Sequence, residues 1–491
     1  MSKLNKDILF LIFEELQNDS KSLFSCLMIN KLWCETVIPI LWRNPWCYDI
    51  NYNDKNYLFL IIASYLTEDI KEYLTRQGIQ LPSFSYKSLL FDYLSFCRNI
   101  NIKTINTIIS IGSFLAYNQF LLQQEFYSLF MKKFIVLKYL DMKSIKHQIF
   151  YFPESKTCLK SLCELKCDTS IDSSYFYGLA RLCQYIQRLI IVNVNTNVNY
   201  GIVKLIEVQM NLKYFEWEDV FEDNFEFNYS RVDPYKEVLL ALEKKADILN
   251  HLKFYFLYVD HTLQRVLPKL HKLKTLIIND FGRSSDDQLK MLIYNDLETL
   301  IIDCILLNAA SIIIKNSGGR LKKILLEPYD FSLHDESFTK DSLFFIRKIY
   351  ENCPSIEYLS LAFSPSKEHF TEFEKLLKIC QNLKSILLTI FNIEEIETNE
   401  KVIENGEELL KVLIRSTPIN LREIRFSDDF IFSLEALEEF FGKWRGRPLT
   451  ILTTDSIYEG EHYTKLIDKY KNDGVIKDFR CEPFIDVIYG L

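Results

Sequence analysis

The sequence has little glycine, little proline and no large excess of charge of either sign. Glycine occurs 13 times and proline 12 times in 491 residues, which excludes a collagen-like chain and a chain dominated by flexible linkers. Lys and Arg total 58 against 66 Asp and Glu, and the net charge of -8 offers no electrostatic footprint for nucleic acid. Apolar residues make up 48% and charged residues 25%, which is typical of a globular protein.

Long apolar runs are also missing. The run Ile8–Phe13 is bracketed by acidic residues and is shorter than the roughly 7–15 apolar residues of a secretory signal. The uncharged stretch Ile105–Leu122 contains Asn, Thr, Ser and Gln, and it is too polar for a spanning helix, which needs about 20 mostly apolar residues. The 12 cysteines are scattered through apolar periodic segments, as free thiols are in a reducing compartment. We therefore expect a soluble cytoplasmic and/or nuclear protein with no membrane partner.

Three short helices are predicted at the N-terminus. The apolar positions of the first recur at helical spacing and are Leu9, Ile12, Phe13 and Leu16. Asn5, Ser20 and Asn30 are suitable caps for the three helices, and Pro39 stops or kinks the third. A domain of this size often needs a partner to bury its apolar face. A plain three-helix cap on the rest of the chain is the alternative.

This segment resembles an F-box. The residues that match the family pattern are Leu4, Asp7, Ile8, Leu9, Ile12, Phe13, Leu16, Leu23, Cys26, Trp33, Leu41 and Trp42. The family usually has proline after the first leucine, and this sequence has Asn5 there. The departure removes some rigidity from the N-terminus and leaves the apolar anchor positions in place.

The resemblance implies that these helices dock on a Skp1-type adaptor, which links through a cullin and a RING subunit to a ubiquitin-charged E2. Such docking is a helix-in-groove type of recognition. By position, the expected adaptor contacts are Leu4, Ile8, Leu9, Ile12, Phe13, Leu16 and Leu23. Packing inside the three helices is the alternative for Phe13, Cys26 and Trp33.

From residue 137 a short unit recurs in which the first, fourth and sixth positions are apolar. Copies begin at Leu137, Leu162, Ile186, Leu212, Leu252, Leu273, Leu297, Leu321, Ile356, Leu383 and Leu421, with a weak copy at Leu449. Most steps lie within or near the range of about 20–29 residues that characterises leucine-rich repeats. Amphipathic segments between the copies predict helices at Asp287–Tyr294, Leu306–Asn316, Asp341–Cys353, Glu368–Cys380 and Glu407–Arg415. The pattern resembles irregular repeats of the F-box/LRR class.

The predicted fold class is therefore α/β, ending in an irregular leucine-rich-repeat solenoid with a curved parallel sheet. Residues 1–48 form the F-box, residues 49–135 a rigid helical connector, and residues 136–491 the solenoid. Three longer steps between repeats carry insertions, at Glu216–Asp233, Glu327–Lys340 and Glu394–Glu408. Such insertions often bind partners, and solvated loops are the simpler interpretation.

The substrate surface is expected on the inner face of the sheet. Side chains alternate along a strand, so the residues between the core positions point to that face. Their middle column is apolar in several repeats, and an exposed apolar stripe marks a binding surface. Charged residues beside this column are included among the expected substrate contacts. The full set is Ile277, Ile301, Lys323, Leu325, Leu387, Glu423 and Arg425. Alternatively, a terminal segment or loop covers the stripe, or the sheet is buried on both faces.

Motifs for catalysis, metal binding or phosphate binding are missing from the sequence. Cys158, Cys163 and Cys167 have no second pair downstream, so core packing is preferred to a zinc site. The basic turn Lys443–Arg447 is interpreted as solvated rather than as a nucleic-acid site. We expect no cofactor, no metal and no catalytic residue.

The sequence thus predicts a substrate-recognition subunit of an SCF-type (Skp1-cullin-F-box) E3 ubiquitin ligase. In this role the chain binds an unknown protein substrate through its repeats, within the Ubl conjugation pathway that leads to proteasomal degradation. Its contribution is proximity and orientation rather than bond chemistry. Two alternatives stay open: a leucine-rich-repeat interaction scaffold without ligase association, and an unrelated enzyme on an α/β array.

Overall fold

The computed structural model describes residues 5–47, 56–81, 89–143, 145–194, 197–220, 235–256, 261–278, 291–303, 307–327, 338–390, 399–427 and 430–482. The chain divides into two compact units, Met1–Leu242 and Glu243–Leu491. Each unit is described by itself below.

The first unit opens with three helices, α1 (Lys6–Glu15), α2 (Ser20–Leu27) and α3 (Lys31–Leu41), which we call the head. Two of the helix starts are fixed by side-chain caps. The Asp19 carboxylate accepts a hydrogen bond from the Ser22 amide at 3.1 Å, and the Asn30 amide oxygen accepts one from the Trp33 amide at 3.0 Å. Pro39 lies in the last turn of α3, so the third helix extends slightly beyond the predicted stop.

The rest of the first unit joins helices to a parallel sheet. Its helices are α4 (Asn56–Ser64), α5 (Glu68–Arg76), α6 (Tyr93–Phe96), α7 (Ile102–Ile109), α8 (Ala116–Lys133), η2 (Ile149–Tyr151), α9 (Ser155–Leu159), α10 (Ser173–Leu182), α11 (Tyr200–Val208) and α12 (Lys236–Glu243). Its strands are β1 (Asn99–Asn101), β2 (Tyr139–Asp141), β3 (Glu164–Asp168), β4 (Arg188–Asn193) and β5 (Tyr214–Asp219). The strands pair in chain order, and every pairing is parallel.

The second unit repeats the same strand-helix alternation. Its strands are β6 (His251–Tyr255), β7 (Thr275–Ile278), β8 (Thr299–Asp303), β9 (Lys323–Glu327), β10 (Tyr358–Phe363), β11 (Ser385–Ile390), β12 (Glu423–Ser427), β13 (Leu449–Thr453) and β14 (Ile476–Cys481). Its helices are α13 (His261–Val266), η3 (Leu267–Lys269), α15 (Leu307–Lys315), α16 (Phe338–Asn352), α17 (Lys367–Ile379), α18 (Asn399–Ser416), α19 (Leu434–Lys443), η5 (Ser456–Glu459) and α20 (Glu461–Asn472). These strands also pair in parallel and in chain order.

The predicted leucine-rich-repeat solenoid is confirmed. Every recurring apolar unit, from Leu137 to the weak copy at Leu449, overlaps one of the strands β2–β13. Two strands were not predicted: β1 lies within the segment expected to be a helical connector, and β14 has no leucine-rich unit. Four of the five predicted repeat helices correspond to α15, α16, α17 and α18. Residues 287–290 of the fifth, Asp287–Tyr294, lie outside the described residues, and residues 291–294 are not helical, so that prediction is wrong in its second half.

The insertions are only partly described. Residues 216–219 of the first belong to β5, and residues 221–233 lie outside the described residues. Residues 328–337 of the second and 394–398 of the third also lie outside them. The remainder of the third insertion belongs to α18, so part of that acidic segment is helix rather than loop.

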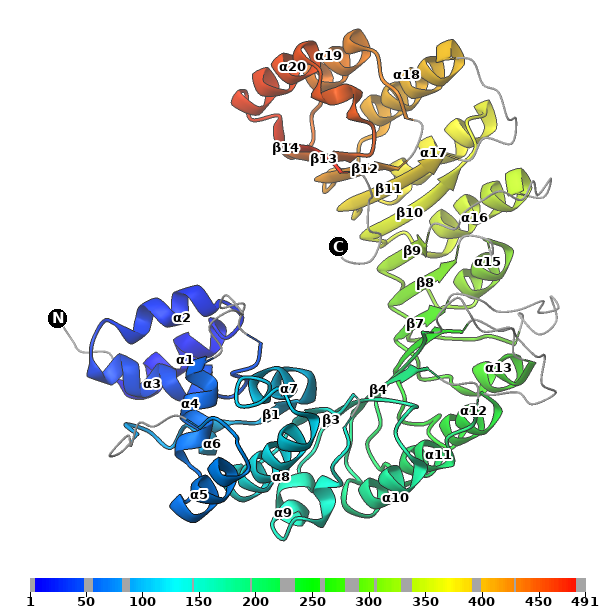
Figure 1. Cartoon of the computed structure of the whole chain (residues 1–491). Coiled ribbons are helices and arrows are strands. Elements are labelled where there is room, and N and C mark those ends of the chain that lie inside the picture. The colour runs from blue at the N-terminus through cyan, green and yellow to red at the C-terminus, as the bar shows by residue number, and fades with distance from the viewer. Residues whose placement is uncertain are drawn as a thin grey trace. The chain divides into compact units, whose positions relative to one another are not determined.

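The core lies between the sheet and the helices, which cover one face of the strands in each unit (Figure 1). The first and fourth apolar positions of each repeat point into it. For example, Leu276, Leu300 and Ile324 stand in register on β7, β8 and β9, and all three are fully buried. Neighbouring helices approach closely: a Cβ added to Gly201 of α11 would stand 2.2 Å from the Ser173 carbonyl oxygen of α10. Only glycine fits at that contact.

The strands β3–β5 end in a buried hydrogen-bonded ladder. The Thr169 hydroxyl donates to the Asn193 side-chain oxygen, and the Asn193 amide donates to a carboxylate oxygen of Asp219, both at 2.8 Å. Asp219 also accepts hydrogen bonds from the Trp217 indole at 2.8 Å and the Tyr235 hydroxyl at 2.5 Å. The ladder supplies partners for polar groups that would otherwise be costly to bury.

The strand β14 differs in composition from the other strands. Its side chains include Lys477, Asp478 and Arg480, and it is only partly buried. Asp478 forms ion pairs with Arg480 at 3.0 Å and with Lys471 of α20 at 3.7 Å. Arg480 also pairs with Glu482 at 3.0 Å. Charge therefore replaces apolar packing on this strand.

Candidate binding surfaces

The head has its own small core. Leu9, Phe13, Leu23 and Val37 are buried, and the rings of Phe13 and Trp33 meet edge to face with centroids 5.2 Å apart. An edge-to-face aromatic pair of this kind contributes about 0.5–1.5 kcal/mol beyond its buried area. Three of the predicted adaptor contacts, Leu9, Phe13 and Leu23, therefore pack against the chain's own helices.

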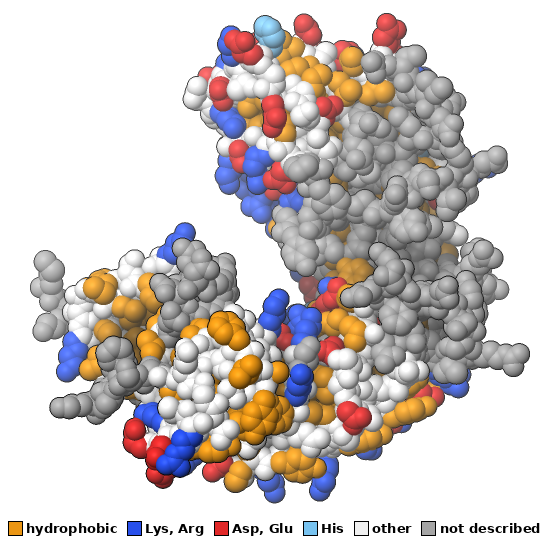
Figure 2. Space-filling view, viewed as in Figure 1, with side chains coloured by type: hydrophobic (Ala, Val, Ile, Leu, Met, Phe, Trp, Pro, Cys, Tyr) orange, Lys and Arg blue, Asp and Glu red, His pale blue; other side chains and the backbone are white. Residues whose placement is uncertain are grey.

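The opposite side of α1 is apolar and exposed. Ile8 and Ile12 are exposed, Ile12 by 44%, and Leu16 is half-buried. Leu4, the remaining predicted contact, lies outside the described residues. We define the head patch by its exposed apolar side chains, which are Ile8, Phe10, Leu11, Ile12, Phe24, Met28 and Ile29. Figure 2 shows hydrophobic side chains gathered on this part of the molecule.

Five members of the head patch, among them Leu11 at 65% and Met28 at 88% exposure, were not predicted. The signal for those on α1 is the unbroken apolar run Ile8–Phe13, since a helix that is apolar all round presents one face to its core and another outward. Helical spacing alone does not tell which of the two faces is buried.

The head is fixed to the first strand of the sheet. Arg43, just after α3, donates to the Glu14 carboxylate at 2.9 Å, and its carbonyl oxygen accepts the Arg98 amide at 2.9 Å. The Trp46 indole donates to the Asn99 carbonyl oxygen of β1 at 2.7 Å. These bonds connect the end of the head directly to the repeat sheet, so the head patch is held in a defined position within the first unit.

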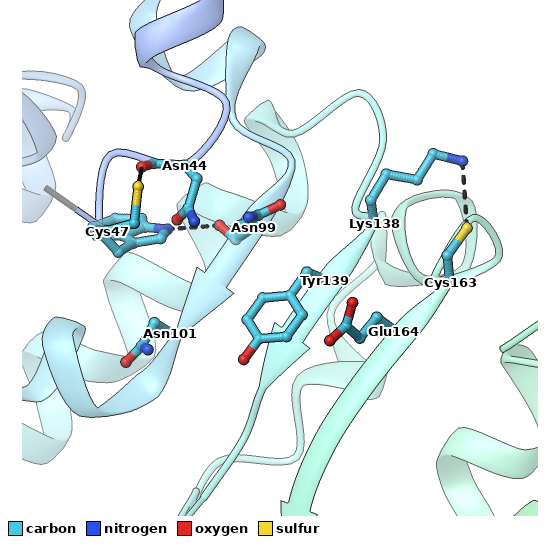
Figure 3. Close-up of a pocket in the computed structure, with 9 residues that line it drawn as sticks. Asn44, Cys47, Asn99, Asn101, Lys138, Tyr139, Cys163 and Glu164 are labelled. Carbon is cyan, nitrogen blue, oxygen red and sulfur yellow. Dashed lines mark hydrogen bonds between the residues drawn. The ribbon is translucent and has the colours of Figure 1, made fainter. Parts of the chain in front are cut away.

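A hollow of about 560 Å³ opens beside that junction (Figure 3). Its lining combines the segment after α3 with the first three strands, and comprises Asn44, Trp46, Cys47, Asn99, Asn101, Lys138, Tyr139, Cys163 and Glu164. Figure 3 shows Tyr139 and Glu164 on neighbouring strands beside the same space. The sequence did not predict this hollow, because its lining comes from segments that are distant along the chain.

Charged groups in and beside the hollow are already paired with protein atoms. The Arg188 guanidinium lies 3.4 Å from the Glu164 carboxylate and stacks over the Tyr214 ring at 4.2 Å. The Lys138 ammonium donates to the Cys163 sulfur at 3.7 Å. Burial raises the pKa of Tyr139, and the nearby Asp141 and Glu164 carboxylates raise it further. Tyr139 therefore stays protonated and can donate a hydrogen bond at physiological pH.

The predicted substrate stripe is buried rather than exposed. Ile301, Leu325 and Leu387 form a buried cluster with Leu452, and Ile277 packs against it half-buried. The expectation of an exposed apolar stripe is therefore wrong at its centre, where Leu325 has no exposed surface. The sequence alternation correctly assigned these side chains to the inner face, but it carries no information on what lies over that face.

The three charged residues predicted beside the stripe occupy different environments. The Arg425 guanidinium is buried and donates to the Glu423 carboxylate at 2.7 Å, which also accepts the Ser385 hydroxyl at 2.8 Å. Lys323 is half-buried, and burial, with a contribution from Arg425, lowers the pKa of its ammonium. Whether Lys323, Glu423 and Arg425 contact a substrate stays a prediction.

The described ranges hold neither a metal-ligand cluster nor a helix that could span a membrane. No group of three His, Cys, Asp or Glu side chains there is placed to hold a metal ion. Cys158 and Cys167 are buried as free thiols, and Cys163 lines the hollow. Across the same part of the chain, no helix combines the length and apolarity that crossing a bilayer requires.

Comparisons with known proteins find likeness to solved structures. No protein-family model matches the chain, and no curated protein does. Among solved structures, a crystal structure of the Rad7 and Elc1 complex in yeast matches with 12% sequence identity and a TM-score of 0.37. The match covers 89% of this chain and 96% of that chain. At these values the likeness assigns no partner and no activity to this protein.

Proposed function

We propose that this protein is the substrate-recognition subunit of an SCF-type ubiquitin ligase. The head patch carries the proposal, because it is an exposed apolar face on helices whose sequence has the F-box pattern. A Skp1-type adaptor, and through it a cullin, would bury that face by helix-in-groove docking. The junction at Arg43 and Trp46 supports the proposal, since a ligase receptor must hold its target in a defined position.

In this proposal the chain has no catalytic residue and acts in the cytoplasm and/or nucleus. The repeats of the first unit offer the target surface, with the hollow beside Tyr139 and Glu164 at its centre. The hollow combines asparagine amides, a protonated tyrosine and paired charges, which suits polar groups of a protein substrate.

The test is affinity capture with a Skp1-type adaptor and its cullin. We substitute Leu11→Asp together with Ile12→Asp, because both side chains are exposed and neither belongs to the core of the head. The matched control is Phe114→Asp with Leu115→Asp, an adjacent exposed apolar pair of the same unit. We expect wild type and control to capture the adaptor, and the head variant to lose it with an unchanged melting temperature. Equal capture by all three proteins would reject the proposal.

A scaffold without ligase association is the second candidate, and Asn5 is the observation that favours it. The family's proline is missing there, and the Asn5 side chain makes no capping hydrogen bond. In the same experiment this candidate predicts no adaptor capture by folded wild-type protein.

A further inference from the structure

One row of residues in the first unit lies where the chain enters its strands, and each member directly precedes one of the strands β1–β5. Backbone hydrogen bonds join the row across the sheet, because the amide of each member donates to the carbonyl oxygen of the member before it. We call it the edge row, and it comprises Arg98, Lys138, Cys163, Gln187 and Lys213. The edge row thus has cationic members and no carboxylate.

The corresponding row of the second unit contains both signs of charge. The same backbone hydrogen bonds join its members, which are Lys274, Glu298, Lys322, Glu357, Lys384 and Arg422. The Lys322 ammonium lies 3.3 Å from the Glu298 carboxylate of the previous repeat, and Lys384 pairs with Glu357 in the same way. In the edge row, no position supplies such a carboxylate.

Two lysines of the edge row therefore keep their charge without a carboxylate partner. Lys138 and Lys213 are exposed, and within the described ranges neither forms an ion pair. The Lys138 ammonium instead contacts the neutral Cys163 sulfur, at 3.7 Å (Figure 3). Arg188, on the strand β4 between the two lysines, is balanced by the Glu164 carboxylate at 3.4 Å. The edge row thus carries a positive charge that attracts anionic groups.

The hollow beside Lys138 adds neutral hydrogen-bonding groups to this charge. The side-chain amides of Asn44 and Asn99 line it, and neither has a hydrogen-bond partner among the described residues. A side-chain amide can donate to the carbonyl oxygen of a peptide bond and accept from its N–H. The volume of the hollow, about 560 Å³, lies within the range of about 300–1,000 Å³ that is usual for binding pockets.

We propose that the edge row and the hollow together bind an extended acidic segment of a protein substrate. The inference rests on the proposed function and names its substrate class. One carboxylate of the segment pairs with Lys138 and another with Lys213, and the end of the segment next to Lys138 enters the hollow. The two lysines precede strands that lie three spacings apart, which is roughly 14 Å at about 4.8 Å per spacing. An extended chain advances about 3.3 Å per residue, so acidic side chains about four residues apart match both lysines.

A nucleic acid suits this surface less well than an acidic peptide. Duplex DNA carries one negative charge per about 1.7 Å of its axis, and its binding depends on many cations. The Glu164 carboxylate lies on β3, between the two lysines, and would repel a phosphate placed there. Separated carboxylates on a peptide can pair with the lysines and leave Glu164 with its own partner, Arg188.

The experiment measures fluorescence anisotropy with the purified full chain and no adaptor. The probe is a labelled serine-rich peptide with two glutamates about four residues apart, and its counterpart has glutamines at those positions. The variant is Lys138→Gln with Lys213→Gln. The matched control is Lys146→Gln with Lys156→Gln, two exposed lysines of the same unit outside the edge row. We expect wild type and control to bind the glutamate peptide saturably, and the variant to bind it about tenfold more weakly.

A second variant tests the charge of the edge row without removing a lysine. Gln187 is exposed and stands next to Lys213 in the row, as Glu357 stands next to Lys384 in the second unit. Gln187→Glu should therefore neutralise Lys213 and weaken the binding of the glutamate peptide several-fold. Gln187→Ala should bind the peptide as wild type does. All variants should keep the melting temperature of wild type, because the substituted side chains are exposed.

Three results would overturn the inference: equal affinity of wild type and the lysine variant for the glutamate peptide, equal binding of the glutamate and glutamine peptides, or tighter binding of a labelled oligothymidine, which would indicate a site for phosphates. The adaptor capture described above is a separate readout. The head variant, Leu11→Asp with Ile12→Asp, should bind the peptide normally. Peptide binding without adaptor capture would reject the ligase role alone, whereas adaptor capture without peptide binding would reject this inference alone.

Discussion

Asn193 donates a hydrogen bond from its side-chain amide to the carboxylate of Asp219, one strand further along the sheet, at 2.8 Å. Because the Trp217 indole and the Tyr235 hydroxyl donate to the same carboxylate, one buried acidic side chain joins β4, β5 and the start of α12.

Replacing Asp219 with alanine should therefore destabilise the first unit. The substitution removes the acceptor of three buried donors, and we expect a loss of about 2–4 kcal/mol in the free energy of unfolding. Asp219→Asn keeps one acceptor oxygen and should lose less. Urea denaturation followed by tryptophan fluorescence measures both values. An alanine variant as stable as the asparagine variant would show that the ladder is not cooperative.

His369 should make stability depend on pH. Its ring nitrogens hydrogen-bond to the Ser342 and Ser366 hydroxyls, each at 2.8 Å, and burial, followed by the charge of Arg347, lowers its pKa to about 4. Since the folded pKa lies below the unfolded value of 6.5, the stabilisation is complete above pH 6.5 and is lost as the pH falls from 6.5 to 4.

We expect wild type to lose about 2–3 kcal/mol more than His369→Gln over that pH range. Both proteins have the same carboxylates, so the contribution of carboxylate titration cancels when the two unfolding free energies are subtracted. Guanidinium unfolding at several pH values measures it. Parallel stability curves for wild type and the variant would contradict the assigned pKa.

Asn5→Pro should stabilise the head. The φ angle of Asn5 is −68°, which is the angle that proline adopts, and the residue precedes the first residue of α1. A compatible proline stabilises by about 0.4–1 kcal/mol, chiefly by restricting the unfolded chain. The measurement is the unfolding free energy, with Asn5→Ala as control. A destabilised proline variant would mean that the Asn5 amide makes a bond proline cannot make.

Trp46→Phe should loosen the junction between the head and the sheet. The substitution keeps most of the ring contact with Phe130 and removes the 2.7 Å hydrogen bond to the Asn99 carbonyl oxygen. We expect a loss of about 1 kcal/mol and faster hydrogen exchange at β1, with the protection of α1 and α3 unchanged. Exchange that rises equally throughout the unit would instead indicate global destabilisation.

The repeats could be predicted from the sequence because packing alone determines them. Leu276, Leu300 and Ile324 sit between sheet and helix whatever the protein binds, so their periodicity is visible in the residue pattern. The strand β14 could not be predicted, because ion pairs of Asp478 and Arg480 replace that pattern.

The candidate binding surfaces were less predictable from the sequence. The exposure of each side chain there depends on which other parts of the folded chain pack against it. Ile8 and Leu9 are equally apolar in the sequence, yet one is exposed and the other is in the core of the head. The alternation assigns Leu325 to the correct face, but it does not show that Leu325 is buried there in a cluster with Ile301, Leu387 and Leu452. The lining of the hollow beside Tyr139 comes from four segments that are distant along the chain, which no local motif encodes.

The charges of β14 have a consequence for the behaviour of the protein at high concentration. An edge strand has unpaired backbone groups that can pair with the edge strand of another molecule and so begin aggregation. On β14, such pairing would strip water from Lys477 and disturb the ion pairs between Asp478 and Arg480. The charged residues that break the apolar repeat pattern on this strand therefore also oppose aggregation through it.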